Sequence, residues 1–272
     1  MDQLKQQVND FIREAGGTWG ISLIDLDHDQ SWAMNGDERF TAASVIKVPI
    51  MAAVFAGAHR GDFRLTDLIE LKRDDQVDGS GVLQHMTPGI KLPIYDYIYL
   101  MIIQSDNTAT NILIDLVGVE AVQSAMRELG MTKSVFYNKL CIVPVKTPAR
   151  NALTASDVGE CLKRLAKAEY VSLYACEQMI SMMKDQQYRD CLPSNLPEED
   201  SEIVGTKADW EVANKTGWVS GIQHDAAIFY VGNRTMVVVT LSKGCQPQTA
   251  RAAMGKIGRA VYEYLKNTQH EV

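Results

Sequence analysis

A serine and a lysine three residues apart, Ser44 and Lys47, open an apolar stretch of the chain. In a helix this spacing places the hydroxyl and the amine on the same face, within reach of each other. A serine becomes a nucleophile at neutral pH only when a neighbouring base takes its proton, and a lysine whose pKa is lowered by burial can be that base. The unpaired backbone N–H of Ser44 near a helix start can also face a developing oxyanion. The pair indicates acyl transfer, although S-x-x-K alone is a common chance match.

A second polar cluster, Ser105-Asp106-Asn107, lies directly before a helical pattern at 109–117. Ser105 could relay a proton to a leaving nitrogen, and the Asn107 amide could hold a substrate carbonyl. Ser, Asp and Asn are also the residues that most often cap helices, so an ordinary cap is the favoured interpretation of this cluster taken alone. Asp106 is expected to be structural in either case.

The third cluster, Lys215-Thr216-Gly217, lies on a predicted strand that leads into a turn at 218–221. A lysine beside a hydroxyl can bind a carboxylate, and a glycine lets a substrate lie close along a strand edge. The alternative is a plain strand end with a surface lysine.

In this order the three clusters form the signature of class A β-lactamases and penicillin-binding proteins, which the chain resembles over nearly its whole length. The resemblance implies that Ser44 is the acylated nucleophile, Lys47 its proton acceptor and Ser105 the proton relay. It also implies a β-lactamase/transpeptidase-like fold. No metal or organic cofactor is implied.

The same resemblance assigns residues to substrate binding. The backbone amides of Ser44 and Trp218 would form the oxyanion hole, and Lys215 with Thr216 would hold a substrate carboxylate. The residues expected to contact the substrate are Asn107, Lys215, Thr216, Gly217 and Trp218.

One part of the family pattern is missing from this chain. Class A β-lactamases carry a glutamate, in an E-x-x-L-N pattern, on a loop after the second cluster, and it holds the water that hydrolyses the acyl-enzyme. The corresponding stretch here lies near Leu140 and Cys141, and no Asp or Glu occurs from residue 129 to 156. Because removing a positioned general base costs about 10²–10⁴ in rate, we expect Ser44 to be acylated but released slowly. Cys141 could be a substitute base or a second nucleophile, but a small buried hydrophobe is the preferred interpretation.

His224, with Asp225 beside it, comes just before a predicted strand. In the resembling family the turn after the third cluster lies close to the site and often supplies a cation for substrate carboxylates. His224 is therefore a candidate substrate ligand or base. The alternative is a surface histidine whose neighbour caps the turn.

Strand patterns at both ends of the chain and helical patterns between them predict an α+β fold. We expect one domain over 1–272, with an antiparallel sheet of about five strands built from both termini and flanked by helices (1–43 and 206–272). A mostly helical lobe (44–205) would be inserted into it. The individual expectations are helices at 2–15, 109–117, 120–129 and 249–266, and strands at 18–26, 31–34, 210–216, 226–231 and 235–241.

Composition narrows the classes of partner. A net charge of −7 argues against binding to nucleic acid or to anionic membranes, because both bind positively charged protein surfaces. No window approaches the roughly 20 apolar residues of a membrane helix. The five cysteines form no CxxC pair, which favours reduced buried thiols over disulfides or a zinc site. The first residues lack a signal-peptide pattern, so we expect a cytoplasmic protein, or one whose export segment has been removed.

The leading interpretation is a serine hydrolase that acts on the amide of a β-lactam or a D-alanyl peptide, a small substrate with a carboxylate. A sensor or binding domain that is acylated or occupied without turnover is one alternative. A peptidase or esterase for a cytoplasmic substrate is another. The sequence leaves the oligomeric state open.

Overall fold

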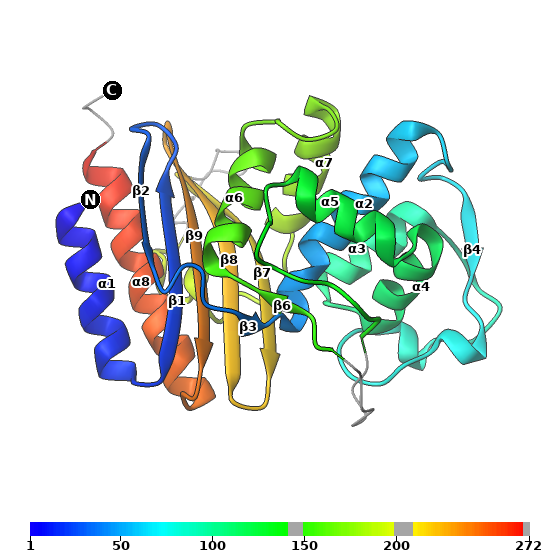
Figure 1. Cartoon of the computed structure of the whole chain (residues 1–272), viewed down its shortest axis with the longest axis horizontal. Coiled ribbons are helices and arrows are strands. Elements are labelled where there is room, and N and C mark those ends of the chain that lie inside the picture. The colour runs from blue at the N-terminus through cyan, green and yellow to red at the C-terminus, as the bar shows by residue number, and fades with distance from the viewer. Residues whose placement is uncertain (141–148, 199–208, 269–272) are drawn as a thin grey trace.

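A five-stranded antiparallel sheet, in the order β2-β1-β9-β8-β7, forms the centre of the computed structural model, which describes residues 1–140, 149–198 and 209–268 (Figure 1). The strands are β1 (Thr18–Asp25), β2 (Gln30–Met34), β7 (Trp210–Val219), β8 (Ile222–Val231) and β9 (Arg234–Lys243). Because β1 pairs with β9, the start and the end of the chain meet inside one sheet. The expected α+β class and the sheet built from both termini are confirmed.

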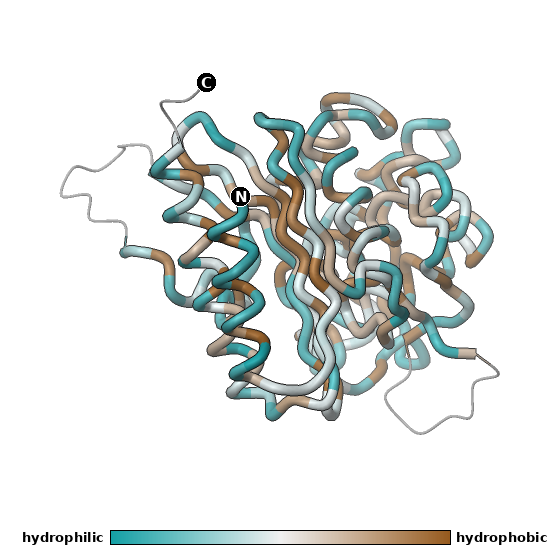
Figure 2. The backbone as a smooth tube through the Cα atoms, turned by 60° about the vertical axis from the view of Figure 1, so that its left-hand side comes forward, coloured by the Kyte–Doolittle hydropathy of each residue, from teal (hydrophilic) through white to brown (hydrophobic). Residues whose placement is uncertain are grey.

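Helices cover both faces of the sheet. Helices α1 (Asp2–Ala15) and α8 (Pro247–Asn267) pack together on one face, and α6 (Ala155–Ala166) lies on the other (Figure 1). In α1 the buried residues Leu4, Val8 and Ile12 recur every four positions, which gives the helix one apolar face toward the strands. Figure 2 shows the hydrophobic stretches of the strands between these helical layers.

The remaining helices form a group beyond β7: α2 (Lys47–Arg60), α3 (Ile94–Ile103), α4 (Asn107–Val117), α5 (Val119–Glu128) and α7 (Leu173–Lys184). Helix α2 is buried from residue 47 to 57, and α3, α4, α5 and α7 surround it. A helix that is apolar on all sides needs such an enclosure. Helix α6 belongs to the same stretch of sequence but packs on the sheet. Within the described ranges, no helix is both long and apolar enough to cross a membrane.

Short elements connect these layers. Two strand pairs lie outside the main sheet, β3 (Phe40–Thr41) with β6 (Ala152–Leu153) and β4 (Leu68–Glu70) with β5 (Lys91–Pro93). The described residues also form the 3-10 turns η1 (Ala43–Ile46), η2 (Arg73–Asp75), η3 (Leu83–His85) and η4 (Leu192–Asn195). Ser44 therefore lies in the 3-10 turn η1, and the helix that it was expected to open begins only at Lys47.

The hairpin between β7 and β8 is tighter than the sequence predicts. Val219 pairs with Ile222, so only two residues form the turn, and Gly221 takes the positive φ of 71° that such turns favour. Gly217 and Trp218 consequently lie inside strand β7, not in a loop. His224 lies inside β8 for the same reason.

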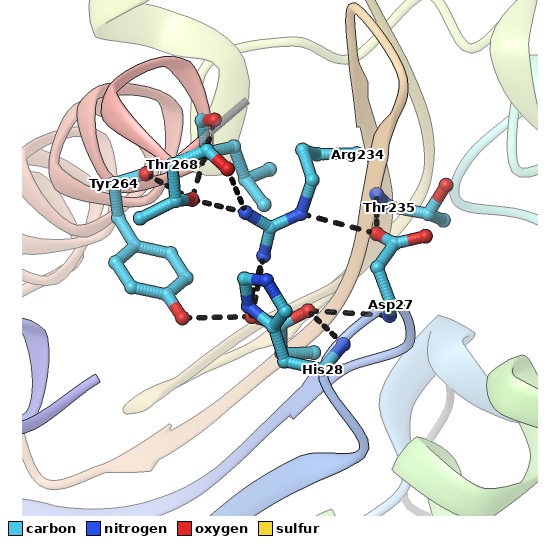
Figure 3. A network of polar contacts seen from close by, with 8 residues as sticks. Asp27, His28, Arg234, Thr235, Tyr264 and Thr268 are labelled. Atoms are coloured by element: carbon cyan, nitrogen blue, oxygen red, sulfur yellow. Dashed lines mark hydrogen bonds and ion pairs between the residues drawn. The ribbon is translucent and has the colours of Figure 1, made fainter. Parts of the chain in front are cut away.

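A buried polar network connects helix α8 to the sheet (Figure 3). The guanidinium of Arg234, on β9, is fully buried and donates to Asp25 Oδ2 of β1 at 2.6 Å. Tyr264 of α8 donates to the same carboxylate oxygen at 2.7 Å, and Arg234 also donates to the carbonyl of Thr268 at 2.9 Å. Because each buried charge is paired and hydrogen-bonded, the network ties β1, β9 and α8 together.

Candidate active site

The structure brings residues of all three sequence clusters together. Lys47 Nζ, at the start of α2, lies 2.6 Å from the Ser105 carbonyl oxygen, 3.1 Å from Ser105 Oγ and 2.8 Å from Asn107 Oδ1. Lys215 Nζ reaches from β7 to the same Ser105 Oγ at 3.1 Å. The Ser105 hydroxyl thus lies between two lysine amines, and the nucleophile candidate Ser44 precedes Lys47 in the adjoining turn.

Lys47 has the surroundings of a general base. Its side chain is fully buried, and this burial, together with the positive charge of Lys215, lowers the pKa of Lys47 well below its ordinary value of 10.5, with Asp106 opposing the shift. A neutral amine can donate its two N–H groups to the Ser105 carbonyl and the Asn107 amide oxygen. Its lone pair is then available to accept a proton.

Lys215 is a second depressed lysine in the site. It is fully buried, and burial lowers its pKa to about 7, with the carboxylate of Asp225 acting in the opposite direction. Its amine also donates to the Thr216 carbonyl at 2.8 Å. Near neutral pH this lysine is partly charged, so it can both attract an anion and exchange a proton with Ser105.

The depressed pKa of Lys215 predicts a rise of the unfolding free energy with pH. Between about pH 7.5 and pH 9.5 the unfolded chain keeps this proton and the native state does not, so stability increases with pH, and Lys47 acts in the same direction. Lys215→Met should reduce the slope by up to about 1.4 kcal/mol per pH unit, the value for one proton. Urea unfolding across this range measures it. An equal slope in both proteins would contradict the depressed pKa.

The second cluster is both a helix cap and a part of the site. Asp106 is the N-cap of α4, where its Oδ1 accepts from the first turn at 2.9 Å and its Oδ2 accepts from Leu83 N at 2.8 Å. The expected structural role of Asp106 is therefore confirmed. Ser105 and Asn107, on either side of this cap, turn toward Lys47. Ser105 adopts a positive φ of 52°, which is uncommon for a residue other than glycine and is typical of functional positions.

The nucleophile turn η1 and strand β7 approach each other closely at Gly217. A Cβ atom at Gly217 would lie 2.8 Å from Ser44 N and 3.0 Å from Val45 N, so only glycine fits here. The backbone N–H of Ser44 consequently lies against the strand that carries Trp218. The Trp218 side chain is partly exposed and packs edge-on against Tyr188, with ring centroids 5.1 Å apart. Sequence reasoning missed Tyr188, because nothing in the sequence pairs it with β7.

Thr216 lies in the wall of the site, but its side chain is fully buried. In the described part of the chain, two buried side-chain atoms have no hydrogen-bond partner, and they are Thr216 Oγ1 and Asn214 Oδ1 on the same strand. The contact between Thr216 and a substrate carboxylate therefore stays a prediction.

The structure places His224 inside the sheet, with both ring nitrogens beside backbone groups. The ring is fully buried, with Nε2 2.9 Å from the Thr41 carbonyl oxygen and Nδ1 3.1 Å from Ser242 N. Burial lowers the pKa of His224 to about 4, so the ring is neutral at pH 7. A surface histidine does not agree with this position, while a contact between His224 and the substrate stays a prediction. The physical reason for this burial is the two-residue hairpin turn, because a turn this short leaves residue 224 within strand β8.

Of the two residues expected near the position of the missing glutamate, Leu140 and Cys141, the structure describes Leu140. Asn111 lies one turn after Asn107 in α4, and its side-chain amide binds the backbone of Leu140 twice, with Leu140 N–Oδ1 at 2.9 Å and Nδ2–Leu140 O at 3.0 Å. The backbone of Leu140 is thereby fixed beside the helix that carries Asn107. Cys141 lies outside the described residues, so its interpretation stays a prediction. Sequence reasoning missed the role of Asn111.

Comparisons with known proteins agree over nearly the whole chain. Residues 3–265 match a model described as the beta-lactamase enzyme family. The β-lactamase OXY-1 of Klebsiella oxytoca is 28% identical over 250 residues, which are 91% of this chain and 82% of that protein. The crystal structure of a β-lactamase from Sphaerobacter thermophilus has a TM-score of 0.89 and 31% identity, covering 98% of both chains. The structure of PBP-A, 24% identical with a TM-score of 0.84 over 98% of this chain and 97% of its own, shares the fold.

Proposed function

The chain belongs to the β-lactamase enzyme family, and from this premise we propose that it forms an acyl-enzyme at Ser44 with β-lactams or D-alanyl amides and releases the acyl group slowly. The observation that carries the proposal is a contrast. Lys47 and Lys215, next to the turn and the strand that form the site, both lie within hydrogen-bond distance of Ser105 Oγ, whereas no carboxylate occurs between residues 129 and 156.

Acylation follows from the geometry of the two lysines and Ser105. Neutral Lys47 takes the proton of Ser44, whose Oγ attacks the carbonyl carbon, and the oxyanion is stabilised by the backbone N–H groups of Ser44 and Trp218. The C–N bond then breaks. Ser105 gives its hydroxyl proton to the departing nitrogen and recovers one from the Lys47 ammonium, 3.1 Å away. Each proton has an acceptor, and Ser44 ends as an ester.

Deacylation has no comparable support. A water molecule must attack the ester carbonyl, and it needs a base to take its proton. Leu140, whose backbone is held by Asn111 beside α4, offers a hydrocarbon side chain at this place. The loss of a positioned base slows such a step by about 10²–10⁴, so the acyl-enzyme is expected to accumulate.

The substrate carboxylate is assigned to Lys215 and Thr216. Because the pKa of Lys215 is about 7, part of the population carries a positive charge at neutral pH and can pair with an anion. A bound carboxylate would raise that charged fraction further. We propose Thr216 Oγ1 as a second donor, since this hydroxyl has no partner within the described ranges.

Intact-mass measurement during incubation with benzylpenicillin tests the proposal. We expect the wild-type protein to gain the mass of one penicillin and to keep it long after free penicillin is removed, whereas Ser44→Ala gains none. Rapid penicillin hydrolysis without a detectable adduct would contradict slow release. Neither adduct nor hydrolysis would favour a domain that only binds its ligand, and hydrolysis of simple esters alone would favour a peptidase or esterase.

A further inference from the structure

His224 lies between the two backbone segments that form the oxyanion site. On β8 it is paired directly opposite Gly217, the residue before Trp218. Its ring nitrogen Nε2 lies 2.9 Å from the carbonyl oxygen of Thr41, three residues before Ser44. One buried side chain therefore joins the segment that carries Ser44 to β8, and β8 pairs directly with β7, the strand that carries Trp218.

We propose that His224 is a positioning residue that fixes the separation between the backbone N–H groups of Ser44 and Trp218. The inference rests on the proposed function, because it concerns the oxyanion hole of the acylation step. His224 touches no reacting atom, and it acts through the backbone on either side of it.

The hydrogen bonds around the ring select one tautomer. Ser242 N donates to Nδ1 at 3.1 Å, and Thr41 O can only accept, so Nε2 carries the proton. The carbonyl of Gln223 also lies 2.8 Å from Nδ1, but a proton on Nδ1 would leave Ser242 N without its acceptor and would set the Nε2 lone pair against the Thr41 carbonyl. Burial lowers the pKa of His224 to about 4, which keeps the ring in this neutral form. The donation to Thr41 is thus a fixed feature of the native state.

The segment that carries Ser44 is closely packed, and the bond from His224 to Thr41 is one of the contacts that hold it. Ala43 has a positive φ of 43°, and the space between Ser44 N and Gly217 is too narrow for a methyl group. On its other side the segment is held by the short β3–β6 pair and by the bond from Ala42 N to Asn151 O at 2.9 Å. Neither of these two contacts joins it to β7 or β8. The bond from His224 to Thr41 makes that connection.

A second side chain on the sheet contacts the same segment and supplies the matched control. Lys243 of β9 lies 5.1 Å above the ring of Phe40 and binds Glu38. Phe40 also packs edge-on against His224, with ring centroids 6.1 Å apart. Lys243→Met removes a contact between sheet and segment without removing the bond to Thr41.

The variants His224→Leu and His224→Gln separate positioning from core filling. Leucine fills the space but has no donor, whereas the glutamine amide can donate from near the Nε2 position. We expect His224→Leu to acylate about 10- to 100-fold more slowly at saturating penicillin with little change in the concentration for half-saturation, because a small misplacement is costly in the transition state. His224→Gln should recover most of the rate, and Lys243→Met should retain all of it. Equal losses in His224→Leu and His224→Gln would indicate a packing role alone.

A fluorophosphonate probe keeps this test independent of the substrate class. Ser44 Oγ forms a bond to phosphorus, fluoride leaves, and Lys47 takes the serine proton, so the reaction uses the oxyanion hole without requiring a β-lactam. If the wild type reacts with the probe but not with penicillin, the proposed substrate is wrong, while the ranking of the variants still tests His224.

The backbone amide signals of Ser44 and Trp218 in NMR spectra give a readout that needs no chemistry. We expect both signals to shift in His224→Leu and to return toward their wild-type positions in His224→Gln. This expectation does not depend on whether the variants have equal thermal stability. Unchanged signals in His224→Leu would overturn the inference, whatever the reactivity of the protein.

Discussion

Leu140→Glu is expected to convert a long-lived acyl-enzyme into one that turns over. The double hydrogen bond from Asn111 fixes the backbone of residue 140 beside α4, the helix whose Asn107 binds Lys47, and we therefore expect a carboxylate introduced there to reach the Ser44 ester. A positioned base raises the rate of such a hydrolysis by about 10²–10⁴. The decay of the penicillin adduct, followed by intact mass after removal of free penicillin, measures the change. The acylation rate should stay close to that of the wild type.

Leu140→Gln is the control for Leu140→Glu, because it has the same size and polarity without a base. We expect its adduct to persist as long as that of the wild type. A second variant, Asn111→Ala in the Leu140→Glu background, releases the backbone of residue 140 and should lose most of the gained rate. If the adduct of Leu140→Glu also persists while its acylation is normal, residue 140 does not hold the place of the missing glutamate.

Lys47→Met is expected to reduce the rate of acylation by about 10²–10⁴, the usual value of a general base. Methionine keeps the length of the side chain but cannot take the proton of Ser44. Removing the buried amine removes its desolvation cost, which stabilises the variant. This gain offsets the loss of stability caused by leaving the Ser105 carbonyl and the Asn107 amide oxygen without a donor. We therefore expect a folded protein that is slow to acylate.

Stopped-flow measurement with a fluorescent penicillin gives the acylation rate of Lys47→Met, and thermal unfolding shows whether it is folded. Lys184→Met, which removes the lysine at the end of α7 that binds Glu211, is the matched control. A wild-type rate in Lys47→Met would exclude Lys47 as the base and would favour a direct transfer from Ser44 to Ser105.

The chemistry of the site could be predicted from the sequence where the residues involved lie close together along the chain. Ser44 and Lys47 are neighbours along the chain, and the S-D-N cluster lies at a helix start, so spacing alone indicates what these residues can do. The two interpretations of Asp106 and its neighbours proved compatible, because the cap and the contacts to Lys47 use different side chains.

The position of His224 could not be read in this way. Its surroundings depend on the number of residues in the hairpin turn, and a change of one residue moves a strand side chain to the opposite face of the sheet. The link between Asn111 and Leu140 was hidden for another reason. It joins a side chain to the backbone of a residue distant in the sequence, and a backbone partner leaves no mark in the pattern of residue types.

The pairing of β1 with β9 has a consequence for the biosynthesis of this protein. As the chain leaves the ribosome, β1 and β2 emerge long before β9, the partner of β1. The early hairpin must wait while the intervening residues are synthesised, and such distant pairings form slowly. Helix α2 and its neighbours can pack before that. Lys215 reaches Ser105 only after strand β7 has been added, so the nascent protein should acquire its reactivity only once β7 has been synthesised and has joined the sheet.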